Sequence, residues 1–244
     1  MNQDAILITG SNGGVGSRLV KYLLDSGARN LACHYRSGRE TVAEILRQAD
    51  LDPETHLFQA ELTDEGQVRA MRLEIEKRLG SVTALVNVAG ASTNGMSWKL
   101  SLADFIDIVN SNLVSAFLCS REFIPSMRER SWGRIINFSS IVGFTGVAGA
   151  SHYCAAKAGL VGLTKALALE LANKNITVNA IALGYFAFGL IQDVPAELQA
   201  QIRARIPVGR FGEANDIGST VKLLLDEQSA FLTGQVVHLN GGQF

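Results

Sequence analysis

Cysteine and net charge are the two features in which this sequence is poorest. The three cysteines, Cys33, Cys119 and Cys154, are odd in number and far apart among 244 residues, so we expect reduced thiols and no disulfide framework. A formal net charge of −1 argues against binding of nucleic acid or an anionic membrane surface through bulk electrostatics. The histidines show no ligand spacing with one another or with the cysteines, and no metal site is predicted.

Long hydrophobic runs are also absent. No uninterrupted apolar stretch approaches the roughly 20 residues that cross a bilayer, so no membrane helix is predicted. The segment from Met1 to Asp4 lacks the basic start of a secretory signal, and we expect a cytoplasmic protein. No repeat, low-complexity tract or linker divides the chain, in which 47% of the residues are hydrophobic. We therefore expect a single domain over residues 1–244.

What the sequence does contain is a regular alternation of two patterns. Strand-like apolar runs occur near residues 5–9, 30–35, 55–59, 83–88, 133–139, 176–181 and 235–239. Helical periodicity occurs between them, near residues 14–26, 39–49, 64–79, 101–129, 151–173 and 214–226. This alternation predicts an α/β fold with a seven-stranded parallel sheet, helices on both faces and a ligand beyond the carboxyl ends of the strands.

A glycine-rich turn follows the first predicted strand. Residues 9–16 read Thr-Gly-Ser-Asn-Gly-Gly-Val-Gly, and the first predicted helix begins within them. Glycines let the backbone approach a pyrophosphate, and a helix N-terminus favours its negative charge. A flexible turn would read similarly, but the strand before it and the helix after it favour a dinucleotide-binding loop in a Rossmann-type, doubly wound fold.

Tyr153 and Lys157 stand four residues apart in a predicted helix. Residues at this spacing share one helix face, so an ammonium lies beside a phenol. A nearby cation lowers the pKa of a phenol, and a phenol tuned in this way exchanges protons with carbonyls and alcohols. The same spacing is common on ordinary amphipathic helices. The pair therefore indicates catalysis only in combination with the other motifs of the chain.

Together these motifs resemble those of the short-chain dehydrogenase/reductase family. The family's Thr-Gly-x-x-x-Gly-x-Gly pattern falls on residues 9–16, and the similarity extends to Gly242. The resemblance implies four catalytic residues, Asn112, Ser140, Tyr153 and Lys157. It implies that Tyr153 donates a proton to the developing alkoxide while a nicotinamide supplies hydride. Lys157 would lower the pKa of Tyr153 and hold the nicotinamide ribose, Ser140 would bond the carbonyl oxygen, and Asn112 would hold a water.

The resemblance also implies a set of cofactor contacts. They are Gly10, Ser11, Asn12, Gly14, Val15 and Gly16 in the glycine turn, Tyr35, Arg36 and Ser37 after the second strand, Glu61 and Leu62 after the third, Asn87, Ala89 and Gly90 after the fourth, Tyr153 and Lys157, and Gly184 and Phe186 after the sixth. Arg36 and Ser37 suit the 2′-phosphate of NADP, and residues 34–39 at the end of the second strand contain no acid, so NADP(H) is favoured over NAD(H).

Several positions depart from the family pattern. Val88 replaces an Asn, Leu183 replaces a Pro, and Phe188 replaces a Thr that contacts the nicotinamide amide. Gly13 stands where many NADPH-using relatives carry a basic residue, and Glu61 replaces an Asp near the adenine. These departures indicate a divergent member of the family. They also leave open the alternative that the protein binds a nucleotide but has lost turnover.

The stretch from about 184 to 211 interrupts the strand–helix rhythm with aromatic and aliphatic side chains and a short polar helix after Pro195. In the resembled family a substrate lid occupies this position, and its apolar character would suit an apolar substrate. The alternative is that these side chains complete the core.

Within the family the chain is most similar to reductases of 3-oxoacyl thioesters carried by acyl carrier protein. A dehydrogenase of another secondary alcohol or ketone, such as a sugar, polyketide or steroid, shares the same motifs. Arg128, Arg130 and Lys174 would flank the site and form a docking patch for an acidic carrier, or they solvate helix ends. The resemblance also implies a homotetramer, for which the stripe Leu160, Leu163, Leu167 and Leu171 fits an interface and internal packing equally well.

Overall fold

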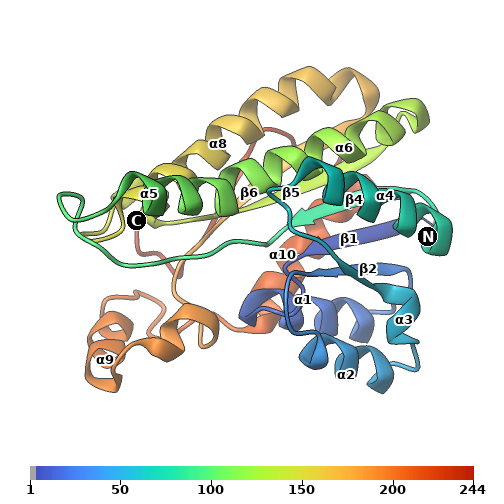
Figure 1. The fold of residues 1–244 in the computed structure, drawn as a ribbon. Coiled ribbons are helices and arrows are strands. Elements are labelled where there is room, and N and C mark those ends of the chain that lie inside the picture. The colour runs from blue at the N-terminus through green and yellow to red at the C-terminus, as the bar shows by residue number, and fades with distance from the viewer. Residues whose placement is uncertain (1–3) are drawn as a thin grey trace.

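Seven parallel strands form one sheet at the centre of the structure, in the order β3-β2-β1-β4-β5-β6-β7 (Figure 1). The structure is a computed structural model that describes residues 4–244. The strands are β1 Ala5–Thr9, β2 Leu31–Tyr35, β3 Leu57–Gln59, β4 Val82–Asn87, β5 Gly133–Ser140, β6 Ile176–Leu183 and β7 Val236–Leu239. The predicted Rossmann-type, doubly wound fold is confirmed, because the strand order reverses between β1 and β4.

The helices follow the predicted pattern with additional short turns between them. They are α1 Gly14–Asp25, α2 Glu40–Gln48, α3 Pro53–His56, α4 Glu65–Leu79, α5 Leu102–Val109, α6 Ser115–Arg130, α7 Val142–Thr145, α8 Ser151–Leu171, α9 Ala196–Ala204 and α10 Ala214–Leu225. The sequence pattern did not predict α3 and α7, since each has four residues and so no full helical period.

Two apolar layers hold the helices to the sheet. On one face, side chains of α4, α6 and α8 pack on the strands, and Phe123 and Met127 of α6 are fully buried there. On the other face lie α1, α2 and α10 (Figure 1). Their side chains Leu19, Leu46 and Val221 are buried there. Burial on both faces explains why the strands read as nearly continuous apolar runs.

The leucine stripe of α8 faces the core. Leu160, Leu167 and Leu171 are buried, and Leu163 packs against the same cluster. Of the two interpretations left open by the sequence, internal packing is therefore the correct one. A subunit interface would have to use other side chains of this helix.

The predicted helix 101–129 is not one regular α-helix. A π-helical turn, Asn110–Val114, separates α5 from α6. By length and composition alone, Leu102–Arg130 could cross a membrane. Within this segment, Leu118 and Phe123 pack into the core. Packing against β4, β5 and α8 accounts for the buried part of this apolar pattern.

The segment 184–211 departs from the sheet after β6. It forms a short 3-10 helix, Gly189–Asp193, and then α9, which begins directly after Pro195 as predicted. Figure 1 shows α9 apart from the sheet, on the same side as α1. A β-bridge between Phe186 and Gly212 closes the base of this excursion.

Candidate active site

A cleft of about 770 Å³ opens along the carboxyl ends of the strands. Its lining includes the glycine turn after β1, the ends of β2, β4, β5 and β6, and the first part of α8. The cleft therefore lies at the reversal of strand order, where doubly wound sheets bind their ligands. Among the described residues, no cluster of three His, Cys, Asp or Glu side chains could hold a metal ion.

The glycine turn is shaped by close backbone contacts. Gly10 has a φ of +65°, and a Cβ there would lie 2.8 Å from the Cα of Ala89. A Cβ at Gly16 would lie 2.2 Å from the carbonyl oxygen of Gly10. Only glycine fits these positions, and the resulting turn exposes the N-terminus of α1 toward the cleft. Backbone N–H groups at such a terminus suit the pyrophosphate of a dinucleotide.

Thr9 joins the glycine turn to the loop after β4. Its hydroxyl oxygen accepts hydrogen bonds from the backbone N–H groups of Val88 and Ala89, at 3.0 and 3.1 Å. The side chain of Val88 takes no part in these bonds, since only its backbone is used. Replacement of the family Asn by Val88 therefore leaves this link between β1 and β4 intact.

The structure brings the four expected catalytic side chains to one end of the cleft. Ser140 ends β5, Asn112 lies in the π-helical turn, and Tyr153 and Lys157 share a face of α8. The Ser140 side chain lies close enough to the Tyr153 hydroxyl to act on its pKa in the lowering direction. A carbonyl oxygen placed beside both hydroxyls would receive two hydrogen bonds that strengthen as negative charge develops.

The pKa of Tyr153 depends on its surroundings in the cleft. Desolvation raises the pKa of Tyr153 to about 12, although the nearby Ser140 side chain acts in the lowering direction. The ammonium of Lys157 lies 5.5 Å from the centroid of the Tyr153 ring and donates to the carbonyl oxygen of Phe138 at 2.8 Å. Desolvation thus dominates the pKa of Tyr153 in this structure, and the lowering effect of Lys157 stays a prediction.

Lys157 itself is buried, and desolvation lowers its pKa to about 8. A hydrogen bond from the hydroxyl of Ser139 to the Lys157 backbone carbonyl, at 2.8 Å, fixes this turn of α8 against β5. Near neutral pH, Tyr153 is therefore a protonated phenol and Lys157 is largely an ammonium. In this protonation state Tyr153 can donate a proton, which the reduction of a carbonyl requires.

Asn112 is held with one polar atom free. Its amide nitrogen donates to the carbonyl oxygens of Ala91 and Ile108, at 2.7 and 2.9 Å. Its Oδ1 atom is buried and has no hydrogen-bond partner among the described residues. A Cβ at Gly90 would lie 2.4 Å from this oxygen and 3.5 Å from Nζ of Lys157, so both atoms border the same space. The π-helical turn is what directs Asn112 there, and such turns often mark functional sites.

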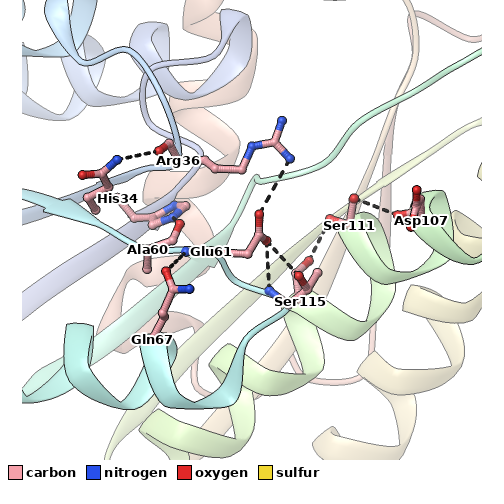
Figure 2. A network of polar contacts seen from close by, with 10 residues as sticks. His34, Arg36, Ala60, Glu61, Gln67, Asp107, Ser111 and Ser115 are labelled. Carbon is pink, nitrogen blue, oxygen red and sulfur yellow. Dashed lines mark hydrogen bonds and ion pairs between the residues drawn. The ribbon is translucent and has the colours of Figure 1, made fainter.

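The far end of the cleft carries a pair of opposite charges. Figure 2 shows Arg36, after β2, extending toward Glu61, after β3; the closest nitrogen and oxygen are 3.9 Å apart. The carboxylate of Glu61 also accepts from the N–H and hydroxyl of Thr63, at 3.1 and 2.9 Å. The Arg36 side chain is 65% exposed, so its charge remains available to a ligand.

Two of the predicted contact residues lie behind the cleft. Ser11 is fully buried and bonds the carbonyl of His34, and Asn87 donates to the side chain of Asn137 at 2.9 Å inside the sheet. The cleft itself is lined by the other predicted residues: Gly10, Asn12, Gly14, Val15, Gly16, Tyr35, Arg36, Ser37, Glu61, Leu62, Ala89, Gly90, Asn112, Ser140, Tyr153, Lys157, Gly184 and Phe186.

The aromatic side chains after β6 belong mainly to the core. Phe186 and Phe188 are each 6% exposed, and their ring centroids lie 5.7 Å apart. The absence of a Cβ at Gly212 leaves room for the ring of Phe186, which would otherwise lie 2.4 Å from it. The apolar character of these two positions therefore describes packing rather than the substrate, and Tyr185 is the aromatic side chain that remains half-buried at the cleft.

The predicted docking patch is wrong for the cleft of this chain. Arg128 and Arg130 end α6 just before β5, and Lys174 lies just before β6. Since the cleft lies at the opposite ends of these eight-residue strands, roughly 23 Å separates the patch from it. Arg130 is also paired with Asp4, at 3.2 Å.

His34 also lines the cleft, and it was not among the predicted site residues. It lies within β2, is 2% exposed, and accepts a hydrogen bond from the backbone N–H of Gly10 at 3.0 Å. In the sequence, only the presence of a polar residue within a largely apolar strand could have drawn attention to His34. Only the fold shows that this side chain reaches the glycine turn.

The observed site fits a nicotinamide dinucleotide. Glycine contacts leave a cradle at the N-terminus of α1, Arg36 offers a cation at one end, and the buried oxygen of Asn112 stands unpaired at the other. Arg36, Glu61 and the glycine turn would hold the adenosine and pyrophosphate, and Tyr153 and Lys157 would hold the nicotinamide ribose.

Comparisons with known proteins agree with this geometry. A family model described as short chain dehydrogenase matches residues 4–199. The chain is 35% identical over 241 residues to the 3-oxoacyl-(acyl-carrier-protein) reductase FabG of Staphylococcus aureus (strain MW2), covering 98% of this chain and 97% of the relative. It is 36% identical over 242 residues to Nodulation protein G of Azospirillum brasilense, covering 99% of this chain and 98% of the relative.

Proposed function

The chain belongs to the short-chain dehydrogenase family of nicotinamide-dependent oxidoreductases, and from this premise we propose that it reduces a 3-oxoacyl thioester to the 3-hydroxyacyl form. The observation that carries the proposal is that Ser140 and Tyr153 line the cleft together, while desolvation raises the pKa of Tyr153 and keeps the phenol protonated. A protonated phenol beside a second hydroxyl suits the delivery of a proton to a developing alkoxide.

Each residue of the site has one task in this proposal. The bound nicotinamide would supply the hydride. Ser140 and Tyr153 would orient the carbonyl oxygen, and Tyr153 would pass its phenolic proton to that oxygen as charge develops. Lys157 would hold the ribose and favour the resulting phenolate, since it carries positive charge below a pH of about 8. Asn112 would use its unpaired oxygen to hold a water close to Lys157.

The thioester substrate is proposed on the names of the full-length relatives, because the cleft geometry suits any secondary alcohol or ketone. The test is NADPH and NADH oxidation with an acetoacetyl thioester, with Tyr153→Phe alongside. We expect turnover that falls about 10²- to 10⁴-fold in the variant, the range of general acid catalysis. Tyr22→Phe, on α1 and outside the cleft, is the matched control and should retain activity.

Other outcomes of this assay have distinct meanings. Dinucleotide binding without thioester reduction would contradict the proposed substrate and direct the search to other ketones and alcohols. Binding without turnover on a broad ketone panel would favour a nucleotide-binding protein that has lost catalysis.

We propose NADP(H) as the preferred cofactor. The support is the exposed guanidinium of Arg36, which can turn from Glu61 toward a 2′-phosphate. Arg36→Ala should weaken NADPH binding about tenfold or more and leave NADH binding within about twofold. Arg39→Ala is the control, because that arginine pairs with Glu54 and does not line the cleft. Equal losses for both cofactors would contradict the assignment.

We also propose a homotetramer. Exposed apolar side chains on α5, α6 and α8 support it, among them Leu102, Ile106, Phe117 and Leu169, with exposures between 41% and 86%. Light scattering during gel filtration tests the proposal. A monomer at micromolar concentration would refute it, and Leu169→Glu should shift the mass downward if α8 contributes to the interface.

A further inference from the structure

His34 joins the two loops that border the adenosine end of the cleft. Its Nδ1 faces the backbone N–H of Gly10 in the glycine turn at 3.0 Å. Its Nε2 faces the carbonyl oxygen of Ala60 after β3, also at 3.0 Å (Figure 2). The residue following Ala60 is Glu61, the partner of Arg36. One imidazole therefore spans from the turn expected to hold pyrophosphate to the loop expected to border adenine.

The two partners determine the protonation state of the ring. An N–H of Gly10 can only donate, so Nδ1 must be an acceptor. The carbonyl of Ala60 can only accept, so Nε2 must carry the proton. The neutral ring with its proton on Nε2 meets both requirements, whereas a protonated ring would set two N–H groups against each other at Gly10.

The surroundings favour that neutral ring. His34 is 2% exposed, and burial lowers its pKa to about 4. Two charged groups act on it, Glu61 from the loop after β3 and Arg36 from the end of β2, and their effects oppose each other. The two hydrogen bonds of the His34 ring, to Gly10 and Ala60, therefore persist through the neutral pH range.

The backbone of His34 strengthens the same connection. Its carbonyl oxygen accepts from both the N–H and the hydroxyl of Ser11, at 2.8 and 2.9 Å. Side chain and main chain together thus bind two consecutive residues of the glycine turn to β2. Gly10 is also the residue whose φ of +65° begins that turn.

We propose that His34 is a positioning residue that holds the glycine turn and the Ala60–Leu62 loop at a fixed separation and thereby determines the affinity for the adenosine half of the dinucleotide. It acts through these two loops and does not contact the reacting atoms. The inference rests on the dinucleotide site proposed above and adds a residue to it.

The test is a series of substitutions that remove one bond at a time. The Oδ1 of Asn overlays Nδ1 of His, so His34→Asn keeps an acceptor for Gly10 and loses the donor to Ala60. The Nε2 of Gln approaches that of His, so His34→Gln keeps the donor to Ala60. His34→Leu removes both. His56→Leu is the matched control, because His56 is also buried and bonded, to the carbonyl of Leu31 at 2.8 Å, but does not line the cleft.

Binding is measured calorimetrically for NADPH, for 2′,5′-ADP as the adenosine half, and for reduced nicotinamide mononucleotide as the other half. We expect His34→Leu to weaken NADPH and 2′,5′-ADP about tenfold or more, since a buried donor and a buried acceptor lose their partners. Binding of the mononucleotide should stay within about twofold. His34→Asn should recover part of the loss, and His56→Leu should show none.

Several results would overturn the role of His34. They are affinities within about twofold of wild type across the series, equal losses for both halves of the dinucleotide, or the same loss in His56→Leu. If His34→Leu does not fold, the Asn and Gln variants decide the question. Failure of the wild-type protein to bind any dinucleotide would refute the proposed site itself, which is a different outcome from an unaffected variant series.

Discussion

The guanidinium of Arg18 lies over the ring of Phe188, 4.5 Å from its centroid. Arg18 belongs to α1 and also donates to the carbonyl of Gly14 at 2.9 Å, so it joins the glycine turn to the segment that follows β6. The next residue along that segment, Gly189, lies so close to Gly14 that a Cβ on Gly14 would be 2.6 Å from its Cα. In place of the family Thr, this chain therefore has an aromatic anchor between the 184–211 segment and α1.

Phe188→Ala should release this anchor. Loss of a buried aromatic ring is expected to lower the free energy of unfolding by about 3 kcal/mol. Amide hydrogen exchange should also accelerate across 184–211 more than elsewhere in the chain. Phe231→Ala is the control, since that ring is fully exposed and its removal should change stability by less than about 0.5 kcal/mol. Uniform acceleration over the whole chain would show general destabilisation and contradict a local anchor.

The reduction rate should depend on pH through Lys157. Because the pKa of Tyr153 is raised to about 12, its phenol stays protonated over the whole pH range of the assay. The pKa of Lys157, lowered to about 8, means that the ammonium is present below that pH and lost above it. We therefore expect kcat/KM for reduction to be level from pH 6 to 7 and to fall above about 8. A rate that rises over this upper range would contradict the assignment.

Gly90→Ala should lower turnover, whereas Gly162→Ala should not. A Cβ at Gly90 would lie 2.4 Å from the buried oxygen of Asn112, which must move and give up its bonds to Ala91 and Ile108. We expect about a tenfold or greater loss of turnover. Gly162 lies in the interior of α8 with open space around it, so Ala there should stabilise by about 0.5 to 1 kcal/mol. Thermal unfolding and a rate assay on both variants test the contrast.

Stability should fall in mild acid because of His34. In the unfolded chain this histidine protonates near pH 6.5, whereas burial in the fold lowers its pKa to about 4. Between these values the unfolded state binds more protons, so the free energy of unfolding decreases as pH falls through this window and levels below it. The contribution is up to about 3 kcal/mol. Denaturant unfolding from pH 7 to 4 should show a shallower slope for His34→Asn, and an unchanged slope would contradict this linkage.

The sequence pattern predicted the bounds of a helix or strand well where the side chains of that element follow one simple pattern of burial. The strand β4 is buried throughout, and its predicted range 83–88 differs from Val82–Asn87 by one residue at each end. The helix 101–129 had the right extent, but the π-helical turn at Asn110–Val114 leaves no mark on a helical period. Such a turn depends on the packing around Asn112, which the sequence does not display.

Residue identity and spacing alone determined the family resemblance and the candidate catalytic set. The spacing of Tyr153 and Lys157 holds on any α-helix, and the glycine turn has few other conformations open to it, so both follow from covalent geometry and local sterics. Only the tertiary structure decided the rest. It hydrogen-bonded Lys157 to the carbonyl oxygen of Phe138 and raised the pKa of Tyr153 by desolvation. It also placed Phe188 in the core and His34 between two loops. Burial and hydrogen bonding between distant segments control these properties, and both arise only when the strands have been brought together.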